Sequence, residues 1–164
     1  MATLGPSGTD AENAAMKIIS EKAINGEINL CSTFFGALNS VVEGKNDIAI
    51  VPSAFPQFAN CVFDFPELEI TESFVLPLKK LVMAKRKNVR EIKNIAIHPA
   101  TRALVKENIK IIEVKSKPLA AKLVSLGKAD ACIASLDVVN ALNLEVVKEF
   151  SQTNMSWNIF RRKK

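Results

Sequence analysis

The sequence predicts an α/β fold, in which the strands of a parallel sheet alternate with helices that cover it. Short apolar runs that end at a proline or serine are followed by stretches with apolar residues at helical spacing. Segments that alternate in this way build a parallel sheet with helices on its faces. Such sheets bind ligands at the carboxyl ends of their strands. Candidate functional residues are therefore expected in the loops that follow the strands.

A strand, a glycine loop and a helix start open the chain at residues 3–15. Gly5 and Gly8 permit backbone angles and close approaches that a side chain would block. Thr9 and Glu12 have the spacing of a capping box, which predicts that the helix begins at Thr9. A glycine loop before a helix N-terminus exposes N–H groups, so Gly8 and Thr9 are candidates for binding a carboxylate or phosphate. A tight turn without a ligand explains the same residues equally well.

The remaining elements follow in order along the chain. Strands are expected at 28–31, 47–52, 82–84, 95–97, 111–114 and 130–135, and helices at 34–42, 116–124 and 137–142. Residues 56–66 are expected to form a connection over apolar residues, and 68–81 an extended segment. Ser116 caps the second of these helices and Pro118 lies in its first turn.

Polar residues stand at the ends of several expected strands. Ser53 follows strand 47–52, Ser135 ends strand 130–135, and His98, Thr101 and Arg102 follow strand 95–97. Histidine titrates near neutrality and can act as an acid or base. A structural role for His98 is favoured, because no carboxylate that could orient its ring is evident. Thr101 and Arg102 are better suited to hold an anion near a helix start.

The composition excludes several classes of function. The chain has 164 residues, an apolar fraction of 48% and a net charge of +5, which suits a soluble protein with a sizeable core. The basic residues form no stripe with aromatic residues, so no nucleic-acid partner is expected. One histidine and three widely spaced cysteines suit neither a histidine-rich metal site nor a disulfide framework. With no apolar run long enough for a signal or a membrane span, we expect a cytoplasmic protein without a membrane partner.

Five spaced segments resemble those of the prephenate dehydratases, and they occur in the same order. A Leu-Gly-Pro-x-Gly-Thr segment stands at residues 4–9, and a strand that ends in Val-Pro stands at 47–52. A His-Pro pair follows at 98–99, then the helix after Ser116 and the strand that ends at Ser135. The resemblance implies a two-lobed α/β fold like that of type II periplasmic binding proteins, with lobe 1 at 1–74 and 139–164 and lobe 2 at 75–138. It also implies a lyase that acts on prephenate without a metal or cofactor, with a homodimer as one option for its assembly. Because the sequence stops at Lys164, we expect no regulatory amino-acid-binding domain of the kind that many dehydratases carry downstream.

Two departures from the dehydratase pattern sharpen the resemblance. Ser53-Ala54-Phe55 replaces the family's polar Glu-Asn segment. In the late Asn-x-Thr-Arg-Phe strand, Ser156 takes the place of the threonine and Trp157 that of the arginine. Both departures resemble the prephenate decarboxylases of the bacilysin pathway. Those relatives remove carbon dioxide, keep the ring hydroxyl and give dihydro-4-hydroxyphenylpyruvate, a precursor of non-proteinogenic amino acids such as anticapsin.

This resemblance assigns two sets of candidate residues. The catalytic candidates are Ser156, Trp157 and Met155, although a plain core role for Trp157 is equally open. The candidates for substrate binding are Gly8, Thr9, Ser53, His98, Thr101, Arg102, Ser116 and Ser135. Two alternatives to the decarboxylase stay open: a dehydratase that forms phenylpyruvate, and a non-catalytic domain that senses a small carboxylate.

Overall fold

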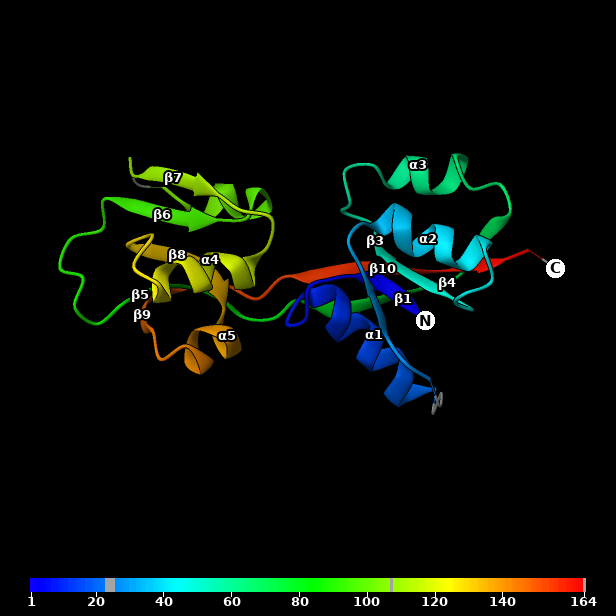
Figure 1. The fold of residues 1–164 in the computed structure, drawn as a ribbon, viewed down its shortest axis with the longest axis horizontal. Helices are drawn as coiled ribbons and strands as arrows, with labels where there is room; N and C mark the ends of the chain where they lie inside the picture. The colour runs from blue at the N-terminus through cyan, green and yellow to red at the C-terminus, as the bar shows by residue number, and fades with distance from the viewer. Residues whose placement is uncertain (23–25, 107, 164) are drawn as a thin grey trace. The chain divides into compact units, whose positions relative to one another are not determined.

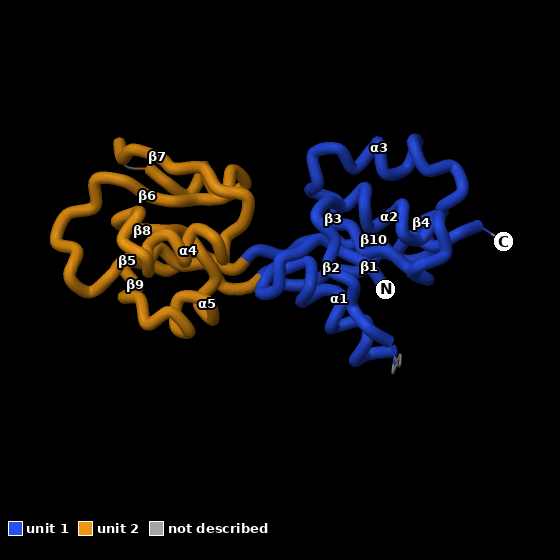
Figure 2. The backbone as a smooth tube through the Cα atoms, viewed as in Figure 1, with its two compact units in different colours: residues 1–78, 153–164 blue, residues 79–152 orange. Residues whose placement is uncertain are grey.

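The computed structural model describes residues 1–22, 26–106 and 108–163, and the chain divides into two compact units. Unit 1 comprises Met1–Leu78 and Thr153–Lys164, and unit 2 comprises Lys79–Gln152, as Figure 2 shows in blue and orange. Each unit is built on its own five-stranded sheet (Figure 1). Within the described stretches, every helix is too short or too polar to cross a bilayer.

Unit 1 has the strand order β2-β1-β3-β10-β4. Strands β1, β2 and β3 are parallel, whereas β10 runs antiparallel to both β3 and β4. Helix α1 lies on one side of the sheet and α2 on the other (Figure 1). The elements of unit 1 are β1 (Ala2–Leu4), α1 (Asp10–Glu21), β2 (Asn29–Cys31), α2 (Phe34–Val42), β3 (Ala49–Pro52), α3 (Phe58–Phe63), β4 (Leu68–Pro77) and β10 (Asn154–Arg162).

The core of unit 1 explains why these elements form. Ala49, Ile50 and Val51 in β3 are all fully buried, as expected for a parallel strand that is covered on both faces. Thr9 and Thr33 cap α1 and α2, and each side chain accepts a hydrogen bond from a backbone N–H of the first turn.

Unit 2 has the strand order β7-β6-β8-β5-β9. Strands β7, β6 and β8 are parallel to one another, and β5 runs antiparallel to β8 and β9. Side chains alternate between two apolar layers: Val82 and Cys132 pack with α4, whereas Met83 and Ile133 lie in the other layer. The elements are β5 (Leu81–Lys85), β6 (Asn94–Ile97), the 3-10 helix η1 (Pro99–Leu104), β7 (Lys110–Glu113), α4 (Lys117–Ser125), β8 (Ala131–Ser135), α5 (Leu136–Ala141) and β9 (Glu145–Glu149).

The structure differs from the sequence-based expectations in four places. A short helix, α3, lies in the expected connection 56–66, and the expected extended segment 68–81 is interrupted between β4 and β5. The turn after Pro99 is a 3-10 helix. Strand β9 was not expected, because all of its residues are exposed at the sheet edge. Since β9 pairs with β5, residues 139–152 lie in unit 2, whereas the expectation assigned them to the first lobe.

Candidate functional site

The predicted site residues of unit 1 lie along one edge of its sheet. The carboxyl ends of the parallel strands β1, β2 and β3 meet at this edge. Because β10 is antiparallel to β3, its first residues, Met155 and Ser156, lie at the same edge. The register pairs Trp157 with Pro52, and the N–H of Ser53 donates to the carbonyl of Ser156 at 2.9 Å. The structure thus brings Ser53 together with Ser156.

The glycine loop after β1 already contains a carboxylate of the protein. Gly8 has a positive φ of 86°, which favours glycine. The Glu12 carboxylate accepts hydrogen bonds from the N–H of Gly8, at 2.6 Å, and from the hydroxyl of Ser7, at 2.9 Å. The Thr9 hydroxyl accepts from the N–H of Glu12 at 3.4 Å. An anionic ligand at Gly8 would have to displace Glu12, so the structure favours the tight-turn interpretation of this loop.

Ser53 and Ser156 lie on the same face of the sheet as Asn158. Successive side chains of a strand point to opposite faces, so Ser156 and Asn158 share one face of β10. The amide of Asn158 is 5% exposed, and its Nδ2 donates to Ser53 Oγ at 2.9 Å and to the Val51 carbonyl at 3.3 Å. Its Oδ1 accepts from Ser73 Oγ at 2.7 Å. Within the described residues, the Ser156 hydroxyl has no hydrogen-bond partner.

Trp157 and Met155 lie on the opposite face of β10 from Ser156. They stand across from Phe74 and Leu76 of β4, and all four belong to the apolar core of unit 1. Trp157 is only 2% exposed, and its Nε1 is the one buried side-chain nitrogen or oxygen among the described residues that has no hydrogen-bond partner. The three catalytic candidates are therefore divided between a polar and an apolar face.

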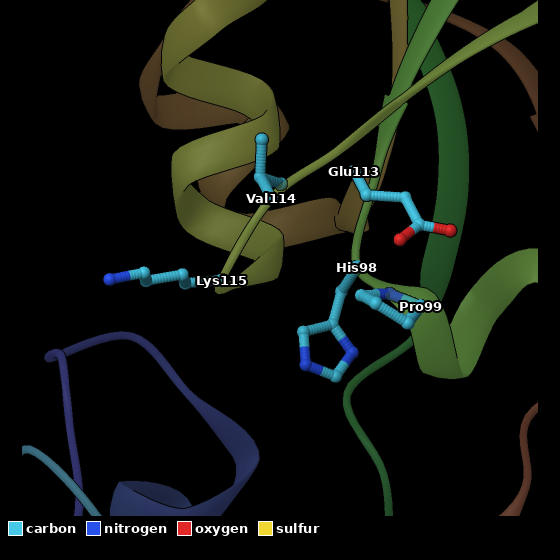
Figure 3. A pocket seen from close by; sticks show the side chains of 5 residues that line it. All are labelled: His98, Pro99, Glu113, Val114 and Lys115. Carbon is cyan, nitrogen blue, oxygen red and sulfur yellow. The ribbon is translucent and has the colours of Figure 1, made fainter.

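A second edge, in unit 2, gathers the other predicted residues. Strands β6, β7 and β8 are parallel, so the segments that follow them meet at one edge of the sheet. A pocket of about 310 Å³ lies there, lined by His98, Pro99, Glu113, Val114 and Lys115. In Figure 3 the side chains of Glu113 and Lys115 extend in opposite directions, with the His98 ring below them.

His98 caps the 3-10 helix that follows β6. Its Nδ1 accepts from the N–H of Ala100 at 3.2 Å, so the ring has the structural role that the sequence favoured. Burial, and after it the positive charge of Lys117, lowers the pKa of His98 below its ordinary value. The ring is therefore neutral at pH 7, and a neutral imidazole contributes no charge for binding an anion.

The remaining candidates of unit 2 differ in what their side chains already do. Thr101 is buried and donates to the carbonyl of His98 at 2.8 Å, and Ser116 accepts from the N–H of Leu119 at 3.2 Å. Ser135 is 2% exposed. Arg102 is exposed and lies 4.0 Å from the Glu113 carboxylate. Arg102 is thus the only charged side chain of these four, and it is exposed to solvent.

The Ser135 hydroxyl acts on a neighbouring carboxylate. Burial raises the pKa of Asp137, but hydrogen bonds from Lys79, Ser135 and the Val138 N–H, together with the positive charge of Lys79, outweigh it and leave the pKa below its ordinary value. Lys79 and Asp137, 2.7 Å apart, line a second pocket of about 400 Å³ at the start of α5. The Lys79–Asp137 ion pair therefore lies at the edge of this pocket, beside Ser135.

Two functional candidates were missed by the sequence analysis. Asn158 is the one polar residue in the apolar run 157–160, and that interruption was the available signal. Lys115 is the second residue after β7 and lines the first pocket, but an isolated lysine carries no signal of its own. Among the described residues, no three histidine, cysteine, aspartate or glutamate side chains are grouped to hold a metal ion.

Comparison with known proteins decides the family. The sequence model described as prephenate dehydratase matches residues 1–161. The chain belongs to the prephenate dehydratase family. Two relatives of this chain are prephenate decarboxylases. The one from Planktothrix agardhii (strain NIVA-CYA 126/8) is 30% identical over 98% of this chain and 87% of its own length. The one from Bacillus amyloliquefaciens is 26% identical over 96% of this chain and 84% of its own.

Solved structures agree on the fold. The prephenate dehydratase of Arthrobacter aurescens, solved in complex with L-Phe, has a TM-score of 0.79 and 22% identity over 99% of this chain. This chain spans 60% of that protein. The periplasmic VFT2 domain of Bordetella pertussis BvgS has a TM-score of 0.62 and 13% identity, over 99% of this chain and 79% of that domain. The predicted α/β fold class, like that of periplasmic binding proteins, is confirmed, as is the predicted resemblance.

Proposed function

We propose that this protein is a prephenate decarboxylase that leaves the ring non-aromatic, and that its product serves the biosynthesis of a non-proteinogenic amino acid. Two relatives that cover nearly the whole chain are prephenate decarboxylases. The observation in the structure that carries the proposal is the position of Trp157. At the place where the dehydratase pattern has an arginine, this chain has an indole buried in the core of unit 1.

The proposed reaction breaks one carbon–carbon bond. The bond between the quaternary ring carbon and its carboxylate breaks, and carbon dioxide leaves. The electron pair shifts through the ring diene, and a ring carbon takes up a proton while the ring hydroxyl stays. The dehydratase reaction differs because hydroxide must leave with the carbon dioxide, and an acidic donor near that oxygen promotes its departure. A dry, apolar surface favours the decarboxylation instead, since the negative charge spreads as the carboxylate is lost.

The residues of unit 1 suit this chemistry. Trp157 is packed in the core with Met155 against it, so the position of the dehydratase arginine carries no charge, and Ser156 and Ser53 offer two hydroxyls on the opposite, polar face of the sheet edge. In our proposal these hydroxyls bind an oxygen of the substrate. Gly8 and Thr9 take a lesser part, because Glu12 occupies the loop.

Taken by itself, unit 2 offers Arg102, which we propose as a side chain able to bind a carboxylate. It is exposed, and its separation of 4.0 Å from Glu113 leaves a weak ion pair that a carboxylate can replace. His98, Thr101, Ser116 and Ser135 shape the surrounding turns, since each already takes part in a hydrogen bond of the protein.

Incubation of the purified protein with prephenate at neutral pH tests the proposal. Carbon dioxide release is followed, and the product is identified by NMR and by its ultraviolet spectrum, with heat-denatured protein as the control for spontaneous loss. Arg102→Gln is compared with Arg90→Gln, which removes an equal charge from an exposed position elsewhere in unit 2. We expect a non-aromatic product that retains its hydroxyl, and a higher KM for Arg102→Gln alone.

Two other results would replace the proposal. Phenylpyruvate above the spontaneous background would make the protein a dehydratase, the activity in the description of its family. Saturable binding of prephenate without turnover would make it a sensor of small carboxylates.

A further inference from the structure

Asn158 holds the side chain of Ser53 from the interior of the sheet. Asn158 is 95% buried, and its amide bridges three strands, because it bonds from β10 to Val51 in β3, to Ser53 just after β3 and to Ser73 in β4. Both N–H groups and the oxygen of the amide are thereby used. A buried amide that is fully hydrogen-bonded is held rigidly, because breaking any of its bonds leaves an unpaired polar group.

The orientation of the amide follows from its neighbours. The oxygen and nitrogen of an asparagine are told apart by the groups that they meet. The Val51 carbonyl can only accept a hydrogen bond, so the group that faces it must be Nδ2. Nδ2 is also the atom 2.9 Å from Ser53 Oγ. Asn158 therefore donates to Ser53.

This contact determines what the Ser53 hydroxyl can do. A serine hydroxyl has one proton to donate, and Oγ of Ser53 is here an acceptor. Its proton consequently points away from Asn158. The Ser53 backbone is also held, since its N–H donates to the Ser156 carbonyl at 2.9 Å. Ser53 itself is exposed at the sheet edge, opposite Ser156.

We infer that Asn158 is a positioning residue that presents the Ser53 hydroxyl, as a hydrogen-bond donor, to an oxygen of the substrate. The inference rests on the proposed function, because it takes prephenate as the ligand of this edge. Asn158 does not contact the substrate itself. It acts from within the sheet by orienting the hydroxyl of Ser53.

A double-mutant cycle between positions 158 and 53 tests the inference. In Asn158→Asp the side chain can only accept, so it draws the Ser53 proton toward itself and away from the substrate. We expect Asn158→Asp and Ser53→Ala each to lower kcat/KM for prephenate about tenfold, as for the loss of one hydrogen bond. In the Ser53→Ala background, Asn158→Asp should have no further effect, because the hydroxyl through which it acts is gone.

Two further variants separate positioning from stability. Thr71→Val removes another side-chain hydrogen bond between β4 and β10, from Thr71 to the Ile159 carbonyl, and leaves Asn158 untouched. It should keep kcat/KM within about twofold of the wild type even if its melting temperature falls. Asn158→Leu replaces the amide without adding a charge, and it stands in for Asn158→Asp if that variant does not fold.

Each result of the cycle decides the inference. Independent effects of the two substitutions would overturn it, and so would a loss in Thr71→Val equal to that in Asn158→Asp. If the wild type forms phenylpyruvate, or binds prephenate without turnover, the proposed function fails, and the same cycle in kcat/KM or in Kd still decides the role of Asn158. If the wild type neither binds nor converts prephenate, both fail together.

Discussion

Replacing Trp157 tests whether its buried indole N–H is unpaired. The side chain is 2% exposed in the core of unit 1, and its Nε1 has no acceptor among the described residues. Truncation to alanine should cost about 3–5 kcal/mol of the free energy of unfolding, the usual range for a buried aromatic side chain. Trp157→Phe keeps one aromatic ring. Its side chain buries about two carbon atoms fewer than tryptophan, which lowers the free energy of unfolding by roughly 1.6 kcal/mol at about 0.8 kcal/mol per carbon.

Trp157→Phe also removes the buried indole N–H that has no acceptor among the described residues. A buried donor without an acceptor costs about 1–3 kcal/mol, and phenylalanine has no such donor. The two effects nearly cancel, so Trp157→Phe should unfold within about 1 kcal/mol of the wild type. Urea denaturation is followed by far-UV circular dichroism, since Trp157 is the one tryptophan of the chain and both variants lose its fluorescence. If the phenylalanine variant is destabilised as much as the alanine variant, the N–H has a partner and the reasoning fails.

Three further predictions follow from other contacts. Glu12→Gln weakens the charge-assisted bonds in the glycine loop and should lower the free energy of unfolding by about 1 kcal/mol, measured in urea; unchanged stability would contradict the capping role. Burial lowers the pKa of His98 in the folded state below 6.5, so the unfolded chain binds its proton first as the pH falls. The contribution of His98 to the free energy of unfolding is fully present above about pH 6.5 and is lost as the pH falls below that value. His98→Asn should therefore flatten the melting temperature between pH 7 and pH 5, and an unchanged slope would exclude His98 as the cause. Burial raises the pKa of Cys61 to about 11 and that of Cys132 to about 12, so a thiol reagent at pH 8 should modify Cys31 first and the other two only in denaturant, as intact mass would show.

Much of the fold could be predicted because the local signals agree with the packing. The second helix was expected at 34–42, and α2 has these bounds, since Thr33 caps its start and Gly44 follows its end with a φ of 74°. Strand β9 could not be predicted in the same way. It has two adjacent valines between charged residues and no buried face, and its pairing with β5 is a contact distant in sequence.

The site was harder to predict than the fold, for two physical reasons. A serine or threonine at a helix start suits an anion, but the same hydroxyl also caps the helix, and Ser116 is used in this way. Neighbouring residues of a strand face opposite sides, so Ser156 and Trp157 could not act on the same face of the sheet although they adjoin in sequence. Asn158 has its role through Ser53 and Ser73, whose distance in sequence hides the contact.

The place of β10 in its sheet has a consequence for how the chain folds during synthesis. Strand β10 lies between β3 and β4, yet the ribosome makes it after the whole of residues 79–152. Unit 2 is one continuous segment and can fold as soon as it emerges. Unit 1 must wait for its last strand, because until then β3 is paired only with β1 and β4 has no partner strand in the sheet. A nascent chain stalled before residue 153 should therefore protect unit 2 from proteolysis and leave unit 1 open to cleavage.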